Sequence, residues 1–270
     1  MSQDLIRTDA TGATGGAAAG FELIELADPV AVAEHVAALL LHERRRRPEL
    51  PLGLATGRTM EPIYRALARQ IGQLPFAEGE RLRERWLSFN LDEYVGLAVE
   101  DPRCFRSVMT ERLVLPLGLD PERVRLPVGT AADPDAEADR YRLELEAAGG
   151  VGLQVLGLGL NGHVGFNEPP CGVDVCCRCI NLSASTRAAN APAFGGNPEA
   201  VPARAITLGL GEILAARSIL LVVTGAAKAG VLRLVLQGPP TPELPASWLQ
   251  HHPRVLVLAD RAALGRSDNG

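Results

Sequence analysis

Short apolar runs alternate with amphipathic stretches along most of the chain. Runs such as LGLAT, WLSFN, GLQVLGLGL, SILLVV and RVLVLAD are rich in Leu and Val and lack the strict alternation of a half-exposed strand. Strands of this kind are covered on both faces, as in a parallel sheet flanked by helices. The pattern therefore predicts an α/β fold: a doubly wound, mostly parallel, Rossmann-like sheet with helices on both faces.

The first predicted helix has recognisable boundaries. Asp28 is a suitable N-cap, Pro29 suits the first helical position, and apolar residues recur at helical spacing as far as Leu40. The run Arg44 to Arg47 ends the helix. Here we expect solvated cations that interact favourably with the helix dipole.

The chain of 270 residues reads as one ordered unit after a short tail. Residues 1–20 are rich in Gly, Ala and Thr and lack apolar periodicity, so they predict a flexible tail. Residues 21–270 are expected to form a single domain. One long irregular excursion, from CGVDVCCRC to AFGGNPEAVP, is expected to form a lid or a wall of the site.

The net charge and the lengths of the apolar runs indicate which kinds of partner the protein can bind. The chain carries a net charge of −5 and has a pI of about 5.6, which argues against binding the phosphate backbone of nucleic acid. No apolar run approaches the roughly 18–20 residues that span a bilayer, and the N-terminus carries Asp4 and Asp9 where a leader would be cationic. We therefore expect a cytoplasmic protein with no membrane partner.

Four of the five cysteines crowd into CGVDVCCRC, and Cys176 with Cys179 makes a CxxC. A zinc site is one interpretation, but neither a second CxxC nor a His-x-x-x-His pair accompanies the cluster. An odd cysteine count also fits a reducing compartment better than a disulfide framework. We expect a loop of free thiols and no metal.

A phosphate-binding turn is predicted after one of the strands, since ligands of open α/β sheets bind beyond the carboxyl ends of the strands. The segment ATGRT follows an apolar run and opens a helix, so its N–H groups and hydroxyls would face an anion. The alternative is an ordinary glycine turn followed by a threonine N-cap at the start of a helix. The absence of GxxxxGK[ST] argues against an NTP site. The candidate ligands are Thr56, Gly57, Arg58 and Thr59.

A second turn, VTGAAK, repeats this design and ends in Lys228, the only lysine among 27 basic residues. Where arginine serves every generic positive charge, a single lysine suggests a position that needs a compact ammonium. Arg187 in STRAAN can reach the same anion, with a plain surface arginine as the alternative.

Acid–base groups follow two further strands. Asp92 and Glu93 come directly after WLSFNL, and Asp92 is the better placed general base, with a helix cap or loop aspartate as the alternative. His163 lies in the glycine-rich segment NGHVGFNEP, where Glu168, five residues later, can hydrogen-bond the imidazole. A histidine oriented by a carboxylate is an acid–base device, whereas a buried structural histidine is the alternative.

Taken in order, LGLATGRTMEPIYRAL, FNLDEYVGL, LGLNGHVGFNEP, LSASTRAANAPAFGG and VVTGAAKAGVL resemble the glucosamine-6-phosphate deaminase (glucosamine-6-phosphate isomerase) family, over about residues 25–260. The related 6-phosphogluconolactonases share the fold but usually have Asp-Glu-Arg in the first acidic motif. Tyr94 and the FNEP ending favour the deaminase branch.

The resemblance implies an enzyme of amino sugar metabolism, a hydrolase acting on a C–N bond. It would convert glucosamine 6-phosphate to fructose 6-phosphate and ammonia without metal or organic cofactor. It further implies that Asp92 moves the proton between C2 and C1, that His163 opens the pyranose ring and that Glu168 is its carboxylate partner. The phosphate would bind to the turn Thr56–Thr59, to Arg187 and to Lys228.

Two departures from the family pattern stand out. Some members carry an aspartate where this chain has Asn161, and an amide can orient the imidazole of His163 but cannot stabilise its cation by charge. The CGVDVCCRC loop replaces the Ser- and Arg-rich segment of an allosteric site in some members, so we expect no allosteric activation of that kind.

The alternatives are a galactosamine-6-phosphate deaminase, then a lactonase, then a sugar-phosphate-sensing module. The segment ITLGL also fits the first of these. The last would need a preceding helix-turn-helix domain, for which 20 residues are too few. The expected partner is a phosphorylated amino sugar, and a homo-oligomer is left open.

Overall fold

Seven parallel strands form the main sheet of the computed structural model, which describes residues 20–266. The predicted tail lies outside these residues except for Gly20. All neighbouring strands of this sheet pair in parallel, so the predicted doubly wound α/β class is confirmed. In spatial order the strands are β1 (Phe21–Leu26), β10 (Val255–Asp260), β9 (Ser218–Val223), β6 (Leu153–Gly157), β2 (Leu52–Leu54), β3 (Ser88–Asn90) and β5 (Val124–Arg125).

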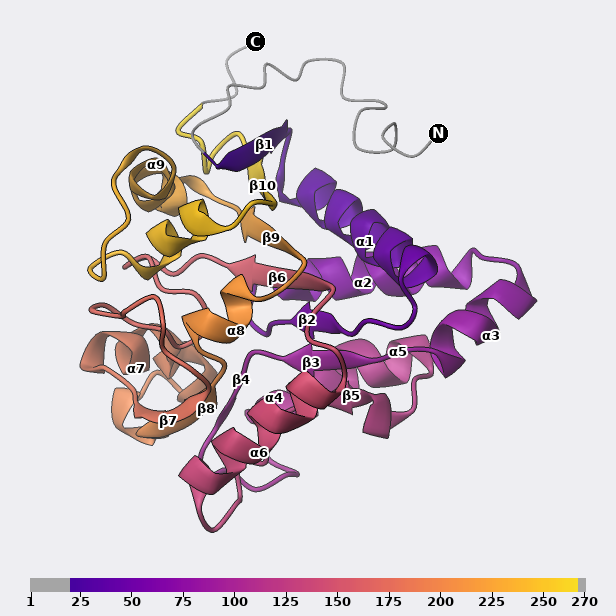
Figure 1. Cartoon of the computed structure of the whole chain (residues 1–270), viewed down its shortest axis with the longest axis horizontal. Coiled ribbons are helices and arrows are strands. Elements are labelled where there is room, and N and C mark those ends of the chain that lie inside the picture. The colour runs from indigo at the N-terminus through magenta and orange to yellow at the C-terminus, as the bar shows by residue number, and fades with distance from the viewer. Residues whose placement is uncertain (1–19, 267–270) are drawn as a thin grey trace.

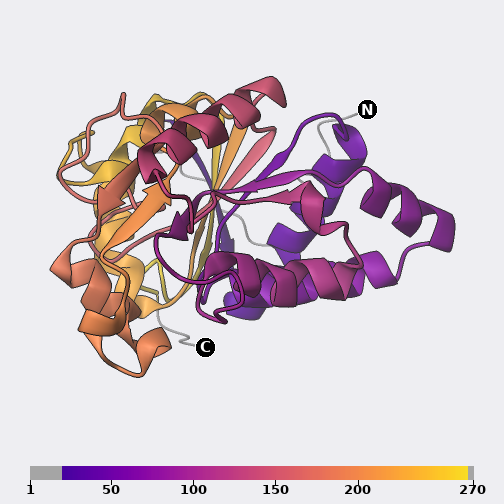
Figure 2. The same ribbon diagram turned by 90° about the horizontal axis from the view of Figure 1, so that it is seen from below.

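Helices cover both faces of this sheet (Figures 1 and 2). They bury the apolar strands on both sides, which is why these strands read as continuous apolar runs. The helices are α1 (Pro29–Arg46), α2 (Met60–Gly72), α3 (Phe76–Glu84), α4 (Phe105–Met109), α5 (Leu115–Leu117), α6 (Pro134–Ala147), α7 (Ala184–Asn190), α8 (Leu210–Leu214) and α9 (Ala229–Gln237).

A second, antiparallel sheet was not predicted. It consists of β4 (Asp92–Tyr94), β8 (Arg204–Thr207) and β7 (Arg178–Asn181). Together with α7 it lies to one side of the main sheet (Figure 1). It has its own small apolar cluster. In this cluster the centroid of the Tyr94 ring lies 5.6 Å from that of Phe166 and 5.7 Å from that of Phe194. The expected irregular excursion is therefore largely ordered into β7, α7 and short turns.

Helix α1 begins as predicted, with Asp28 Oδ1 accepting a hydrogen bond of 2.8 Å from the Ala31 N–H. The expectation of a solvated arginine run at its end is wrong for Arg44, which is buried because it lies on the same helix face as Leu40 and Leu41. Its guanidinium donates hydrogen bonds to three backbone carbonyls, and burial lowers its pKa to about 10. The acceptors are the carbonyls of Pro48, Leu50 and Arg85.

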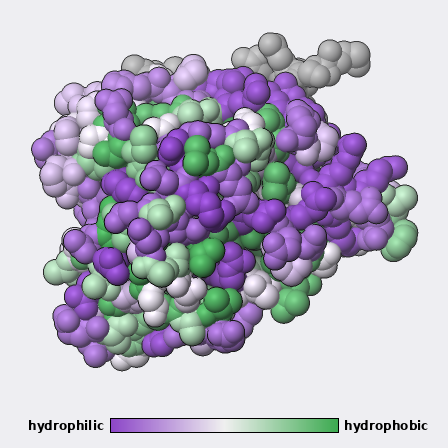
Figure 3. All heavy atoms as spheres, turned by 60° about the horizontal axis from the view of Figure 1, so that its bottom comes forward, coloured by the Kyte–Doolittle hydropathy of each residue, from purple (hydrophilic) through white to green (hydrophobic). Residues whose placement is uncertain are grey.

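Apolar side chains lie scattered among polar ones on the face shown in Figure 3. No helix within residues 20–266 combines the length and the apolar character that crossing a membrane would require.

We expect Arg44→Ala to destabilise the fold, because it leaves three carbonyls of the segments leading into β2 and β3 without their donor. The expected loss in the free energy of unfolding is about 2–4 kcal/mol, measured by urea denaturation. Arg46→Ala is the matched control, since Arg46 is exposed on the same helical turn. Equal effects of the two substitutions would contradict this assignment.

Candidate active site

Four neighbouring strands of the main sheet, β9, β6, β2 and β3, end at the same edge, and each is followed by a segment that sequence analysis singled out (Figure 1). These segments carry Lys228, His163, the turn Thr56–Thr59 and Asp92 respectively. Strand order reverses between β2 and β6, where ligands bind in open α/β sheets. The predicted residues therefore converge on one edge.

The turn after β2 has the geometry of an anion cradle. Gly57 adopts φ +106°, and the Met60 N–H closes the turn on the Gly57 carbonyl at 2.9 Å. Thr59 is the N-cap of α2, yet its hydroxyl makes no capping hydrogen bond. The hydroxyl is therefore left available to a ligand at the helix N-terminus.

Two cations stand close to this turn. The pKa of Lys228 is lowered, first by burial and then by the charge of Arg58, which places the two groups near each other. Neither side chain forms an ion pair within the described part of the chain. Two nearby cations without a carboxylate partner favour an anionic ligand.

The Asp92 side chain is the buried carboxyl of the site. The residue is 5% exposed, and burial, followed by the charge of Glu93, raises the pKa of Asp92 to about 8. No hydrogen bond to its carboxyl group occurs among residues 20–266. A Cβ built on Gly165 would lie 3.5 Å from Asp92 Oδ2, so the backbone that follows His163 passes directly against this carboxyl. A buried carboxyl with so high a pKa is suited to proton transfer near neutral pH.

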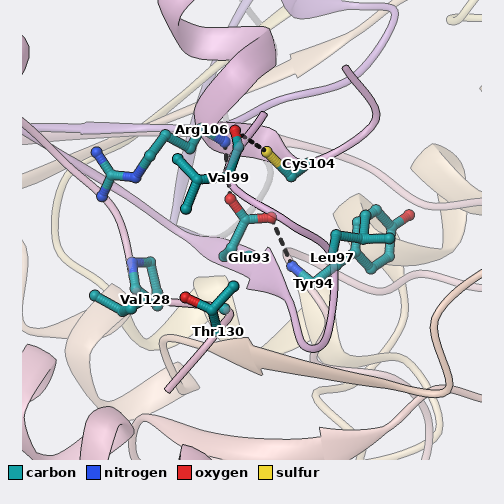
Figure 4. A pocket seen from close by; sticks show the side chains of 10 residues that line it. Glu93, Tyr94, Leu97, Val99, Cys104, Arg106, Val128 and Thr130 are labelled. Atoms are coloured by element: carbon teal, nitrogen blue, oxygen red, sulfur yellow. Dashed lines mark hydrogen bonds between the residues drawn. The ribbon is translucent and has the colours of Figure 1, made fainter. Parts of the chain in front are cut away.

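Its neighbour Glu93 has a structural role (Figure 4). Its oxygens accept hydrogen bonds of 2.8 Å from the backbone N–H groups of Tyr94, Phe105 and Arg106. The last two belong to the first turn of α4, so Glu93 caps this helix. The helix-cap alternative was considered for Asp92, whereas the structure gives the capping role to Glu93, so Asp92 remains the candidate base.

The imidazole of His163 is held by the loop that carries it. Nδ1 lies 2.6 Å from Asn161 Oδ1. Because an amide oxygen can only accept, Nδ1 carries the hydrogen, and Nε2 of the neutral ring has a free lone pair. The ring packs on Gly159, where an added Cβ would lie 2.3 Å from Cε1 of His163. The position therefore requires glycine.

Burial, more than the neighbouring charges, keeps the His163 imidazole neutral. Burial lowers the pKa of His163, the carboxylate of Glu168 acts to raise it, and the ammonium of Lys228 acts to lower it. These contributions place Glu168 and Lys228 within electrostatic reach of the imidazole. A neutral ring near pH 7 is the form that accepts a proton.

The expected hydrogen bond between Glu168 and His163 is absent from the described part of the chain. Glu168 instead accepts from the Ser183 N–H at 2.9 Å, from Ser183 Oγ at 2.5 Å and from Thr186 Oγ1. These donors lie at the start of α7, which satisfies the carboxylate and draws it away from the imidazole. The role of Ser183 was not predicted, although a serine before a short helix is a common N-cap.

Arg187 also lies on α7. Its NH2 is 3.1 Å from Glu199 Oε2, and its Nε is buried without a hydrogen-bond partner among residues 20–266. The side chain is 20% exposed, so it is not the freely solvated arginine that was considered as an alternative. The structure therefore leaves one donor of Arg187 available and places a carboxylate on another.

A residue that sequence analysis missed is Asn167, which fixes the loop carrying His163. It is fully buried, and its Nδ2 donates to the carbonyls of Val164 and Leu208 at 3.1 and 2.9 Å. Its Oδ1 accepts from Arg178 NH1 at 3.0 Å. It thus joins the loop to β8 and to β7. The only sequence signal was its place inside FNEP.

None of the five cysteines forms a disulfide. Cys171 and Cys177 are buried, whereas Cys176 is exposed. Among residues 20–266 there is no group of three or more His, Cys, Asp or Glu side chains arranged to hold a metal ion.

Known proteins match nearly the whole chain. The family described as glucosamine-6-phosphate isomerases/6-phosphogluconolactonase matches residues 27–257. A glucosamine-6-phosphate deaminase of Rhodopirellula baltica is 41% identical over 254 residues, covering 92% of this chain and 98% of that protein. One of Streptomyces coelicolor is 40% identical over 247 residues, covering 91% of this chain and 92% of that protein.

Solved structures agree in fold. A monomeric glucosamine-6-phosphate deaminase superposes with a TM-score of 0.85 at 34% identity, covering 91% of this chain and 99% of that one. A 6-phosphogluconolactonase from Thermotoga maritima reaches a TM-score of 0.66 at 19% identity, covering 89% and 98%, a likeness of fold alone. With the family match over most of its length, the chain belongs to the glucosamine-6-phosphate isomerase/6-phosphogluconolactonase family.

Proposed function

We propose that the protein converts glucosamine 6-phosphate and water to fructose 6-phosphate and ammonia. The observation that carries this proposal is the buried Asp92 carboxyl, whose pKa is raised to about 8, at the sheet edge that also holds His163, Arg58 and Lys228. Relatives at about 40% identity that are named glucosamine-6-phosphate deaminases support the choice of substrate.

The phosphate would bind at the turn after β2 and at the turn after β9. Backbone N–H groups and hydroxyls of Thr56–Thr59 would donate to it, and Lys228 and Arg58 would balance its charge. Arg187 on α7 would complete the site. Binding the phosphate at one end of the sugar leaves the reacting carbons toward Asp92 and His163.

Ring opening would use His163. Nε2, bare in the neutral ring, takes the proton of the C1 hydroxyl, the bond between C1 and the ring oxygen breaks, and the same nitrogen returns the proton to that oxygen. Asn161 holds the tautomer that this step needs. Glu168 supports the transient imidazolium at a distance through its charge.

Isomerisation and deamination would use Asp92. Ionised Asp92 removes the C2 proton of the open-chain aldehyde and delivers it to C1. One proton also passes from the C2 amino group to O1, so that C1 becomes an alcohol and C2 a ketimine. Water adds to this ketimine, and ammonia departs, so the nitrogen is lost without any change in overall oxidation state. Each of these steps is a proton transfer or a hydrolysis, so none requires a metal or an organic cofactor.

The nearest alternative substrate is galactosamine 6-phosphate, and the next is a 6-phosphogluconolactone. Ammonia release from the two amino sugar phosphates, assayed side by side with lactone hydrolysis, separates these activities. A phosphorylated sugar substrate and free thiols also support a cytoplasmic location. A homo-oligomer stays open and is decided by light scattering.

Asp92→Asn tests the base. Loss of a general base typically costs about 10²–10⁴ in rate, so ammonia release and exchange of the C2 hydrogen with deuterated solvent should fall together. In the unmodified protein kcat/KM should rise as the pH increases through about 8, because Asp92 must be ionised. Exchange at the unmodified rate in Asp92→Asn would remove Asp92 from the mechanism.

The same variant should be more stable than the unmodified protein. The pKa of Asp92 is higher in the folded state than in the unfolded state, so the unmodified protein loses stability as the pH rises from the ordinary aspartate pKa of about 4 toward about 8. An asparagine has no such dependence. The gap in unfolding free energy should therefore widen across this window, as measured by denaturation at several pH values.

Lys228→Met tests the phosphate site. A charge-assisted contact is worth about 1.5–3 kcal/mol, so KM for the sugar phosphate should rise about 10- to 150-fold. The thermal stability should change little, because Lys228 has no ion pair to lose in the described part of the chain. An unchanged KM would exclude Lys228 from phosphate binding.

Gly159→Ala tests the placement of His163. The added methyl group would overlap the imidazole, so His163 should be displaced and kcat should fall by about 10² or more. Gly157→Ala is the matched control two residues earlier, since its Cβ would meet only Met60 Cε, at an ordinary 3.6 Å. Thermal melts of both variants check that the fold is kept. Comparable activity of the two would argue that the packing of the ring on Gly159 is unimportant.

A further inference from the structure

The ion pair between Arg187 and Glu199 joins a mostly buried side chain to an exposed carboxylate. Glu199 lies on the short turn Pro198–Ala200, and its side chain is 82% exposed. Among residues 20–266 its carboxylate makes no hydrogen bond or ion pair other than that with Arg187, at 3.1 Å. It can therefore leave the guanidinium by rotating into solvent.

Arg187, in contrast, is held by its surroundings. Its helix α7 is fastened at the first turn, where Ser183 and Thr186 donate to Glu168. The guanidinium is mostly buried, and its Nε faces the interior without a partner among residues 20–266. Arg187 thus has more hydrogen-bonding capacity than Glu199 satisfies.

We propose that Glu199 is a competing carboxylate, which occupies Arg187 in the free protein and is displaced when the substrate phosphate binds. The inference rests on the proposed function, in which Arg187 is one of the phosphate ligands. Glu199 then sets the affinity for the phosphate and is a specificity-determining residue. An anion that binds Arg187 no more strongly than the Glu199 carboxylate does gains little from displacing it.

The phosphate binds Arg187 more strongly than the Glu199 carboxylate does. Ion pairs with a solvent-exposed partner are weak, whereas a phosphate dianion carries more charge and can accept two parallel hydrogen bonds from one guanidinium. The phosphate therefore displaces the carboxylate and loses only a small part of its affinity in doing so. From the usual strength of an exposed pair, that loss is about two- to five-fold.

The test compares Glu199→Gln with the unmodified protein. KM for glucosamine 6-phosphate and the dissociation constant of inorganic phosphate, measured by calorimetric titration, should both fall about two- to five-fold, with kcat unchanged. The matched control is Glu146→Gln, which breaks the 2.5 Å pair with Arg142 at the far end of α6 and should alter neither constant. The advantage of Glu199→Gln should shrink at high salt.

Unchanged or weaker phosphate binding in Glu199→Gln would overturn the proposal. Weaker binding would mean that Glu199 prepares Arg187 for the phosphate. The Arg187→Met background gives a second measurement, in which Glu199→Gln should have no effect; an effect of the same size there would also overturn it. Calorimetry with inorganic phosphate needs no turnover, so a failure of deamination in the unmodified protein is distinguished from a failure of this inference.

Discussion

Parallel pairing of four neighbouring strands is the constraint on which the rest of the site depends. Because β9, β6, β2 and β3 run in the same direction, the segments that follow them must all emerge at one edge of the sheet. That edge collects a buried carboxyl, an imidazole and two cations from positions as far apart in the chain as Arg58 and Lys228. The direction of the strands alone thus brings these groups to one edge of the sheet.

The site carries unfavourable electrostatics that the surrounding fold must maintain. Asp92 is buried beside Glu93 and takes up a proton on folding near neutral pH, and burial lowers the pKa of His163 and of Lys228. Each shift opposes the charge that the group would carry in water. Burial of these groups therefore both shifts their pKa values and makes the folded state less stable than it could be.

Helix α7 links the acid–base groups to the candidate phosphate ligands. Ser183 and Thr186 at its first turn donate hydrogen bonds to Glu168. The next residue, Arg187, forms an ion pair with Glu199. Residues on both sides of this helix, Leu182 and Ala191, belong to the apolar cluster of the small antiparallel sheet, which anchors the excursion at both ends of α7.

The sequence by itself determined the sheet class and the groups at the strand ends, because apolar runs, glycine turns and the residues that follow them are local features. Asp92, His163 and Lys228 were found in this way. Only the tertiary structure decided which partner each side chain meets. Glu168 bonds to residues 15 and 18 positions later instead of to His163, and Arg44 turns inward to carbonyls as far as 41 positions away. Such contacts depend on how distant segments pack, and no local pattern records that packing.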